Sequence, residues 1–356
     1  DAGVILAAER RLPVCELEIE LLSGSASAVI DAARRWVAQH GVWLDTRSKA
    51  ERGDLLSRGE TVAAVRKAQP VALSDDMPAP RAMRRVLASC CEQISVNASQ
   101  VASGEYLAEH VHQLRVGLRR LRTALRLFKG IADTAALDDA ATSLFRRLGG
   151  ARDEAAVGRP LEEALGRALA DVGLSLPTPH WQPPPDEQGA PPADASVRDA
   201  ATQTLLLDLL ACTREPDPPP TASDPEPAAR ELIERRLKRW HRQVVADAKR
   251  FAELDDAGRH ALRRRAKRLR YALEFANDLY EPSVVKRYQK RLRQTLERLG
   301  EVIDVMVGLQ GYRALADSEP GVLFALGWLA QRRDRLVAQC EPELKAFVRV
   351  KPFWKG

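Results

Sequence analysis

Several features are scarce in this sequence, and each scarcity narrows what the protein can be. Aromatic residues make up 5% of its 356 residues, and no apolar run approaches the roughly 18 residues that a membrane span needs. No charged segment followed by an apolar one opens the chain, so we expect neither a secretory signal nor membrane contact. The five cysteines show no CxxC spacing, which predicts reduced thiols in a cytoplasmic protein without a disulfide frame or a zinc site.

Acidic residues are absent from two segments that are rich in cations. The first is HQLRVGLRRLRTALRLF, residues 112–128, and no Asp or Glu occurs between His110 and Gly130. The second is HALRRRAKRLRYALEF, residues 260–275, and no acid occurs between Ala257 and Leu273. The net charge of +6 is moderate, so the position of the charge is more informative than its total.

Both segments place their cations on one face of a predicted helix. At about 100° per residue, the cations of the first segment fall within an arc of roughly 80°, next to an apolar stripe. Like charges at i,i+4 repel unless an anion offsets them, so the pattern favours a polyanion-binding face, with a solvated charged face as the alternative. The two cationic faces consist of His112, Arg115, Arg119, Arg122 and Arg126, and of His260, Arg263, Lys267 and Arg270.

The two segments belong to an internal repeat. His260 matches His112 and Arg263 matches Arg115 at an offset of 148, while RLGEVID (298–304) matches RLGGARD (147–153) at an offset of 151. A repeat of this length predicts an all-α fold of two pseudo-symmetric four-helix bundles, with a short partial α/β segment at the N-terminus. A pseudo-twofold axis would make the two cationic helices face one shared channel.

The paired motifs HxLRxxxRRLR and HxLRxxxKRLRY, each followed by RLG, resemble the CHAD domain, a helical domain named for its conserved histidines. The resemblance covers about residues 81–347 and implies binding of inorganic polyphosphate along a basic central groove or pore. Thr123 stands where the second copy has Tyr271, so a phenol contact is expected on one side only. We therefore predict that polyphosphate is bound by His112, Arg115, Arg119, Arg120, Arg122, Arg126, His260, Arg263, Lys267, Arg268, Arg270, Tyr271, Arg147, Arg298, Lys290 and Arg291.

Several of these residues could instead have a purely structural or solvent-facing role. Lys290, Arg291, Arg147 and Arg298 extend the cationic track or simply face solvent. The two histidines bind phosphate or are structural, since neither has the neighbours of a metal ligand or of a catalytic base. Asp153 and Asp304 occupy matched positions, either as partners of the arginine rows or as a structural pair.

The N-terminal sixty residues have a different character. Strands are expected at Val4–Ala8 and Val14–Leu22, with Glu16, Glu18 and Glu20 on one face, followed by a helix at Ser25–His40. CELEIELLSG together with SKAERG is similar to the C-terminal end of a CYTH domain, a tunnel-shaped triphosphatase family. The ExExK motif of that family is absent because this chain, which we interpret as a fragment, starts too late to include it.

The predicted helices and breaks give the domain organisation. Beyond the linker we expect helices at Arg81–Ala102, Glu109–Lys129, Asp138–Val172, Ser196–Thr213, Ala228–Leu254, Gly258–Tyr280, Val284–Leu315 and Pro320–Phe347, the last ending near Glu341. The predicted domains are a CYTH-like segment at 1–60, a linker at 61–80, a first four-helix repeat at 81–213 with a Pro-rich loop at 174–195, a connector at 214–227 and a second four-helix repeat at 228–350.

The sequence thus predicts a non-catalytic module that holds long-chain polyphosphate, without metal or cofactor, in the cytoplasm or at polyphosphate granules. The scarcity of aromatic residues favours polyphosphate over single-stranded nucleic acid, whose sites usually add stacking platforms. Two alternatives remain open: a CYTH-type triphosphatase with an accessory helical domain, and a generic polyanion-binding protein that takes nucleic acid non-specifically. The sequence does not indicate the oligomeric state.

Overall fold

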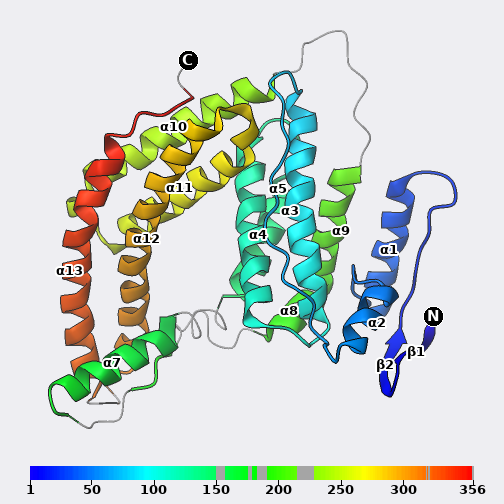
Figure 1. The fold of residues 1–356 in the computed structure, drawn as a ribbon, viewed down its shortest axis with the longest axis horizontal. Helices are drawn as coiled ribbons and strands as arrows, with labels where there is room; N and C mark the ends of the chain where they lie inside the picture. Colours follow the sequence, from blue (N-terminus) through cyan, green and yellow to red (C-terminus); the bar gives the residue numbers. More distant parts are fainter. Residues whose placement is uncertain are drawn as a thin grey trace. The chain divides into compact units, whose positions relative to one another are not determined.

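The computed structural model describes residues 1–149, 157–174, 179–182, 191–214, 228–317, 319 and 321–354. These residues are mostly helical, and one two-stranded sheet lies at the N-terminus (Figure 1). The chain forms two compact units, the first from residues 1–148 and 191–229, the second from residues 149–190 and 230–356.

The first unit is built around four helices that contact one another in a closed order. Helix α3 packs against α4, α4 against α5, α5 against α9 and α9 against α3. Leu114, Leu118 and Leu121 form the apolar stripe of α4 and are completely buried, as the helical period predicts. The elements of this unit are β1 (Ala2–Ala7), β2 (Arg10–Cys15), α1 (Ala26–His40), α2 (Lys49–Ser57), α3 (Ala79–Ala102), α4 (Ala108–Leu127), α5 (Ala135–Arg147), α8 (Ala193–Arg198) and α9 (Ala200–Arg214).

The second unit contains the four helices of the second repeat and one additional helix. The long helices α12 and α13 lie side by side (Figure 1), and α11 packs against α12. Helix α7 joins this group, because Leu161 and Trp181 approach α12 so closely that only glycine fits at Gly308 and Gly311. The elements are α7 (Arg159–Asp171), α10 (Ala229–Lys249), η3 (Phe251–Glu253), α11 (Asp256–Phe275), η4 (Asn277–Leu279), α12 (Pro282–Arg313) and α13 (Val322–Val348).

This division differs from the predicted domain boundaries in two respects. Residues 149–190, placed by sequence in the first repeat, group with the second unit through the contacts of α7. Residues 1–60 are part of the first unit, because Ile30 and Val37 of α1 are buried against Leu207 of α9. Most of the predicted loop at 174–195 and nearly all of the connector at 214–227 lie outside the described part of the chain.

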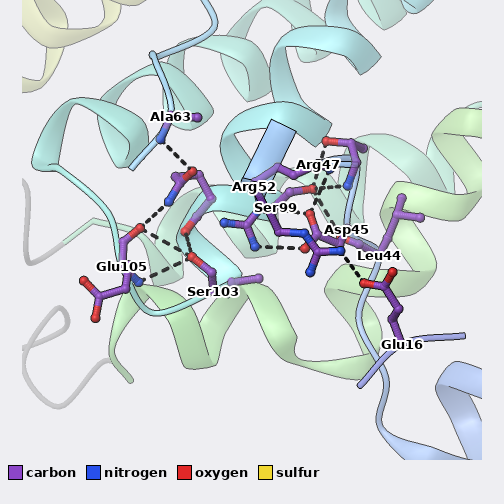
Figure 2. A network of polar contacts seen from close by, with 12 residues as sticks. Glu16, Leu44, Asp45, Arg47, Arg52, Ala63, Ser99, Ser103 and Glu105 are labelled. Carbon is purple, nitrogen blue, oxygen red and sulfur yellow. Dashed lines mark hydrogen bonds and ion pairs between the residues drawn. The ribbon is translucent and has the colours of Figure 1, made fainter. Parts of the chain in front are cut away.

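The segment between α2 and α3 is attached along α3. The backbone N–H of Ala63 donates to the side chain of Gln100 at 3.1 Å (Figure 2), and that of Arg66 donates to Asn97 Oδ1 at 3.3 Å. Val71 and Leu73 are buried. The predicted linker at 61–80 is therefore an ordered strap whose backbone groups are satisfied by polar side chains of α3.

The predicted strand at Val14–Leu22 is wrong. The chain turns at Ala8, which has a φ of 52°, and β2 pairs with β1 only from Arg10 to Cys15. Glu16 lies beyond the strand and pairs with Lys49 at 2.8 Å. It also pairs with Arg52 (Figure 2). The hydrogen bond from Lys49, together with Arg52, lowers the pKa of Glu16 below its usual value. Two of the three carboxylates expected on one strand face, Glu16 and Glu18, are instead paired with cations of α2.

Two predicted helix ends are also wrong. The segment Ser196–Thr213 is two helices, because Asp199 adopts an extended ψ of 138° and its carboxylate accepts a hydrogen bond from Ala201 N–H. Helix α13 does not end near Glu341 but continues through Pro342 to Val348. Its last turns are held by the burial of Leu344 and Phe347.

Candidate functional site

The cationic face of α4 forms a row along one side of the helix, which we call the α4 row: His112, Arg115, Arg119, Arg122 and Arg126. Exposure increases along it, from the buried Arg115 through the half-buried Arg119 and Arg122 to the exposed Arg126. Side chains at the edge of a packed seam are held in place while their charged ends reach solvent.

Helix α5 supports the buried end of the α4 row. The guanidinium carbon of Arg115 lies 4.5 Å from the ring centroid of Phe145, and that of Arg119 lies 4.7 Å from it. Arg115 Nη1 also donates to the backbone carbonyl of Leu148, directly after α5. One aromatic ring and one carbonyl therefore orient two adjacent arginines of the row.

A carboxylate neutralises the exposed end of the α4 row. Arg122 Nε lies 3.0 Å from Asp138 Oδ1, and Arg126 Nη2 lies 3.7 Å from Asp138 Oδ2. The acid that the sequence of α4 lacks is thus supplied by α5 in three dimensions. Arg122 and Arg126 share one negative charge, so this end of the row keeps a net positive charge.

Helix α11 carries the corresponding α11 row, His260, Arg263, Lys267 and Arg270, all half-buried. Arg263 passes beside Gly300 of α12, where a Cβ would lie 3.2 Å from its Nη2 atom. Gly300 matches Gly149 in the repeat, so the same arginine reaches the RLG segment in both units. Arg270 pairs with Glu274 at 2.7 Å, which places a carboxylate at the end of this row too.

Two arginines predicted to bind polyphosphate face the preceding helix instead of the rows. Arg120 is 1% exposed and donates to Gln93 Oε1 at 2.7 Å and to Ser89 Oγ at 3.1 Å. Arg268 donates to Gln243 Oε1 at 3.4 Å, and its guanidinium carbon lies 4.8 Å from the Trp240 ring centroid. In each unit, therefore, an arginine of the cationic helix donates to a glutamine of the helix before it, which ties these two helices together.

The outer predicted residues do not share one environment. Arg147 ties α5 to the junction of α8 and α9 through Asp199 at 2.9 Å, whereas its repeat counterpart Arg298 is exposed and pairs with Glu301 at 3.1 Å. Arg291 pairs with Glu343 at 3.4 Å, and Lys290 is exposed. Tyr271 is 3% exposed, with Arg270 over its ring, so its phenol lies in the core of the second unit.

The histidines divide into two kinds. His112 and His260, which begin the two rows, are half-buried. His110 is buried, its Nδ1 accepts the N–H of Leu107 at 3.2 Å and its Nε2 donates to the carbonyl of Ala63 at 3.0 Å. Burial lowers the pKa of His110. In the described part of the chain no group of three or more His, Cys, Asp and Glu residues could hold a metal ion.

Three contributors to the site could not be found by reading α4 and α11 alone. Phe145 and Asp138 come from α5, and Gly300 comes from α12. A usable signal exists for Gly300, because it lies within the RLG segment that repeats. The role of the two matched aspartates stays a prediction, since Asp304 is exposed and Asp153 lies outside the described residues.

Comparison with known proteins identifies the family. The CHAD domain family model matches residues 85–311. The chain belongs to the CHAD domain family. The crystal structure of the CHAD domain from the plant Ricinus communis is similar, with 29% sequence identity, a TM-score of 0.64 and coverage of 81% of this chain and 98% of that one.

The extent of the match bears on two other predictions. Residues 1–84 precede the matched range, and the CYTH resemblance of residues 1–60 stays a prediction. Among the described residues, no helix is long and apolar enough to cross a membrane, as the sequence predicts.

Proposed function

We propose that this CHAD domain binds inorganic polyphosphate without catalysis, through the α4 row and the α11 row. The observation that carries the proposal is the recurrence of one arrangement. In each unit a helix presents a histidine and three or more cations on one face, and an arginine of that face contacts the RLG segment of a later helix. That both rows face one channel stays a prediction.

The chemistry of the rows suits a chain of phosphates. Successive row residues stand one helix turn apart, about 5.4 Å, so guanidinium and ammonium groups repeat along the helix. Arginine donates paired hydrogen bonds to phosphate oxygens, and lysine adds a point charge. Phe145 contacts Arg115 and Arg119, which indicates that the ring supports guanidiniums; this favours a ligand without bases over nucleic acid.

The carboxylates of the N-terminal segment support a binding function over a triphosphatase. Lys49 lies within 2.9 Å of both Glu16 and Glu18, and Arg52 pairs with Glu16 as well. Carboxylates engaged in this way are poor ligands for a divalent metal. In a cell, such a module would bring its protein to polyphosphate granules in the cytoplasm.

The test is a double charge reversal, Arg119→Glu with Lys267→Glu, one change in each row. Because a charge-assisted hydrogen bond contributes about 1.5–3 kcal/mol, we expect at least about a 100-fold loss of affinity for long-chain polyphosphate. Arg35→Glu with Lys67→Glu removes the same charge at exposed positions of the first unit and serves as the matched control. Circular dichroism should show the same helix content in all three proteins.

The outcome separates the competing functions. Affinity that is equal in the row variant and in the control would refute the two rows as the binding surface. Repeating the titration with excess single-stranded RNA distinguishes the ligand class. Displacement of polyphosphate by the excess RNA would indicate a generic polyanion surface, whereas a polyphosphate receptor should resist it.

A further inference from the structure

Helix α10 carries a third row of cations that neither repeat motif includes. Arg235, Lys238, Arg239 and Arg242, here called the α10 row, fall within an arc of about 100° on an α-helix. All four side chains are exposed, and no Asp or Glu occurs from residue 235 to residue 246. This is the same absence of acids that marks the α4 and α11 rows.

The α10 row differs from the other rows in its neutralisation. Asp138 pairs with the end of the α4 row and Glu274 with the end of the α11 row. Within the described part of the chain, no carboxylate forms an ion pair with any residue of the α10 row. On a solvated helix face, residues at i and i+4 usually carry charges of opposite sign. Four exposed cations in one row repel one another instead and destabilise the helix.

The α10 row makes its neighbourhood positive. The pKa of Arg236, a half-buried residue at the edge of the row, is lowered by burial and by the positive charges of Arg239 and Arg235. An anion bound along the row would relieve this repulsion. The lowered pKa of Arg236 agrees with the clustering of charge that the positions of the four side chains already establish.

The row leads toward a cationic cavity at the C-terminal end of α10. Lys249 lies in the same arc as the α10 row, two turns beyond Arg242, and from Arg235 to Lys249 the helix rises about 21 Å. Lys249 lines a cavity of about 390 Å³ with Lys345 and Arg349 of the α13 end. Glu341, the carboxylate in the lining, pairs with Lys345 at 3.2 Å, so the cavity keeps an excess of two cations.

We propose that the α10 row and this cavity form a second polyphosphate track, used by long chains and not by short ones. The inference rests on the proposed function of the α4 and α11 rows. A short oligophosphate is satisfied by the few cations of one row. A long chain held by the α11 row has phosphates left over, and the exposed α10 row of the same unit offers them unneutralised charge.

The test compares two triple variants of the full chain. Arg235→Glu, Arg239→Glu and Arg242→Glu reverse the α10 row, while Arg11→Glu, Arg35→Glu and Lys67→Glu reverse exposed cations of the first unit. Each triple lowers the formal charge by six, from +6 to zero. Titrations use long-chain polyphosphate and tripolyphosphate, each over a series of salt concentrations.

For the α10 triple we expect about a tenfold or greater loss of long-chain affinity beyond the control. The slope of log affinity against log salt should become shallower by about 2, since about 0.7 counterions are released for each phosphate neutralised. Affinity for tripolyphosphate should match that of the control triple. Reversed charges repel one another as the native ones do, so helix stability should change little.

The contrary outcomes are distinguishable. Equal long-chain affinity and equal salt slope in the two triples would refute the α10 track while leaving the proposed function intact. An equal loss for both ligands in the α10 triple would refute its specificity for long chains. A wild-type chain that binds no polyphosphate would refute both proposals.

Discussion

The carboxylate of Asp138 offers a sharp test of the α4 row, because its removal should change stability and affinity in opposite directions. Asp138 lies 3.0 Å from Arg122 Nε and 3.7 Å from Arg126 Nη2, and its side chain is partly exposed. For a phosphate bound about 7 Å from this carboxylate, the repulsion in water is about 0.6 kcal/mol. The change Asp138→Asn should therefore tighten polyphosphate binding about threefold at low salt.

The same change should destabilise the first unit slightly. Ion pairs at a partly exposed position contribute up to about 1 kcal/mol, so the free energy of unfolding should fall by no more than that. Isothermal titration at low salt measures the affinity, and urea unfolding measures the stability. A gain in affinity that disappears at high salt would agree with the electrostatic cause.

Asp139 provides the matched control for this prediction. It is the next residue of α5, is exposed, and forms no ion pair with the α4 row. Asp139→Asn changes the net charge and the first turns of α5 in the same way. If both variants gain affinity equally, only net charge matters; if Asp138→Asn gains none, phosphate does not reach Arg122 and Arg126.

Two further predictions concern the packing of each unit. Gly311→Ala places a Cβ 2.2 Å from Trp181 Nε1, so we expect a loss of at least about 2 kcal/mol in the second unit. Burial raises the pKa of the Cys340 and Cys90 thiols to about 12, so both react slowly in the folded protein. In the Gly311→Ala variant, we expect faster alkylation of Cys340 in the second unit while Cys90 in the first unit stays protected. Unchanged protection of both thiols would contradict this prediction. Burial lowers the pKa of His110, so the stability due to its neutral ring is present above the unfolded pKa of about 6.5 and is lost as pH falls below it. Urea unfolding should show a smaller difference between wild type and His110→Gln at pH 5.5 than at pH 7.5, and an equal difference would refute this.

Much of the fold follows from local rules that act within one element. The 3.6-residue period correctly predicts which side of α4 is buried, and of the two serines at the start of the predicted helix, Ser25 and Ser27, it is Ser25 that caps α1. The RLG repeat correctly indicates that two similar helical units exist. These features depend on residues a few positions apart, and a sequence shows such residues directly.

The remaining features depend on contacts between elements far apart in sequence. Nothing in residues 157–171 shows that α7 packs on α12, since the deciding feature is the absence of side chains at Gly308 and Gly311. The extent of β2 depends on where the chain turns and on the ion pair between Lys49 and Glu16, the first residue after the strand. Likewise, the sequence of α4 shows no acid beside its cations, but in the structure Asp138 of α5 pairs with Arg122.

The cations of the repeated motif have two roles: some hold the RLG segment in place, and others are proposed to bind phosphate. Arg115 donates to the carbonyl of Leu148 and Arg263 lies against Gly300, so these arginines hold the later helix of each unit against the row. Their replacement would disturb packing and binding together, and a loss of affinity would not identify the ligand surface. Arg119 and Lys267 occupy the next turn, half-buried and beyond this contact. For this reason the reversal of Arg119 and Lys267 tests the proposed binding surface more directly than any change to the most recognisable arginines of the motif.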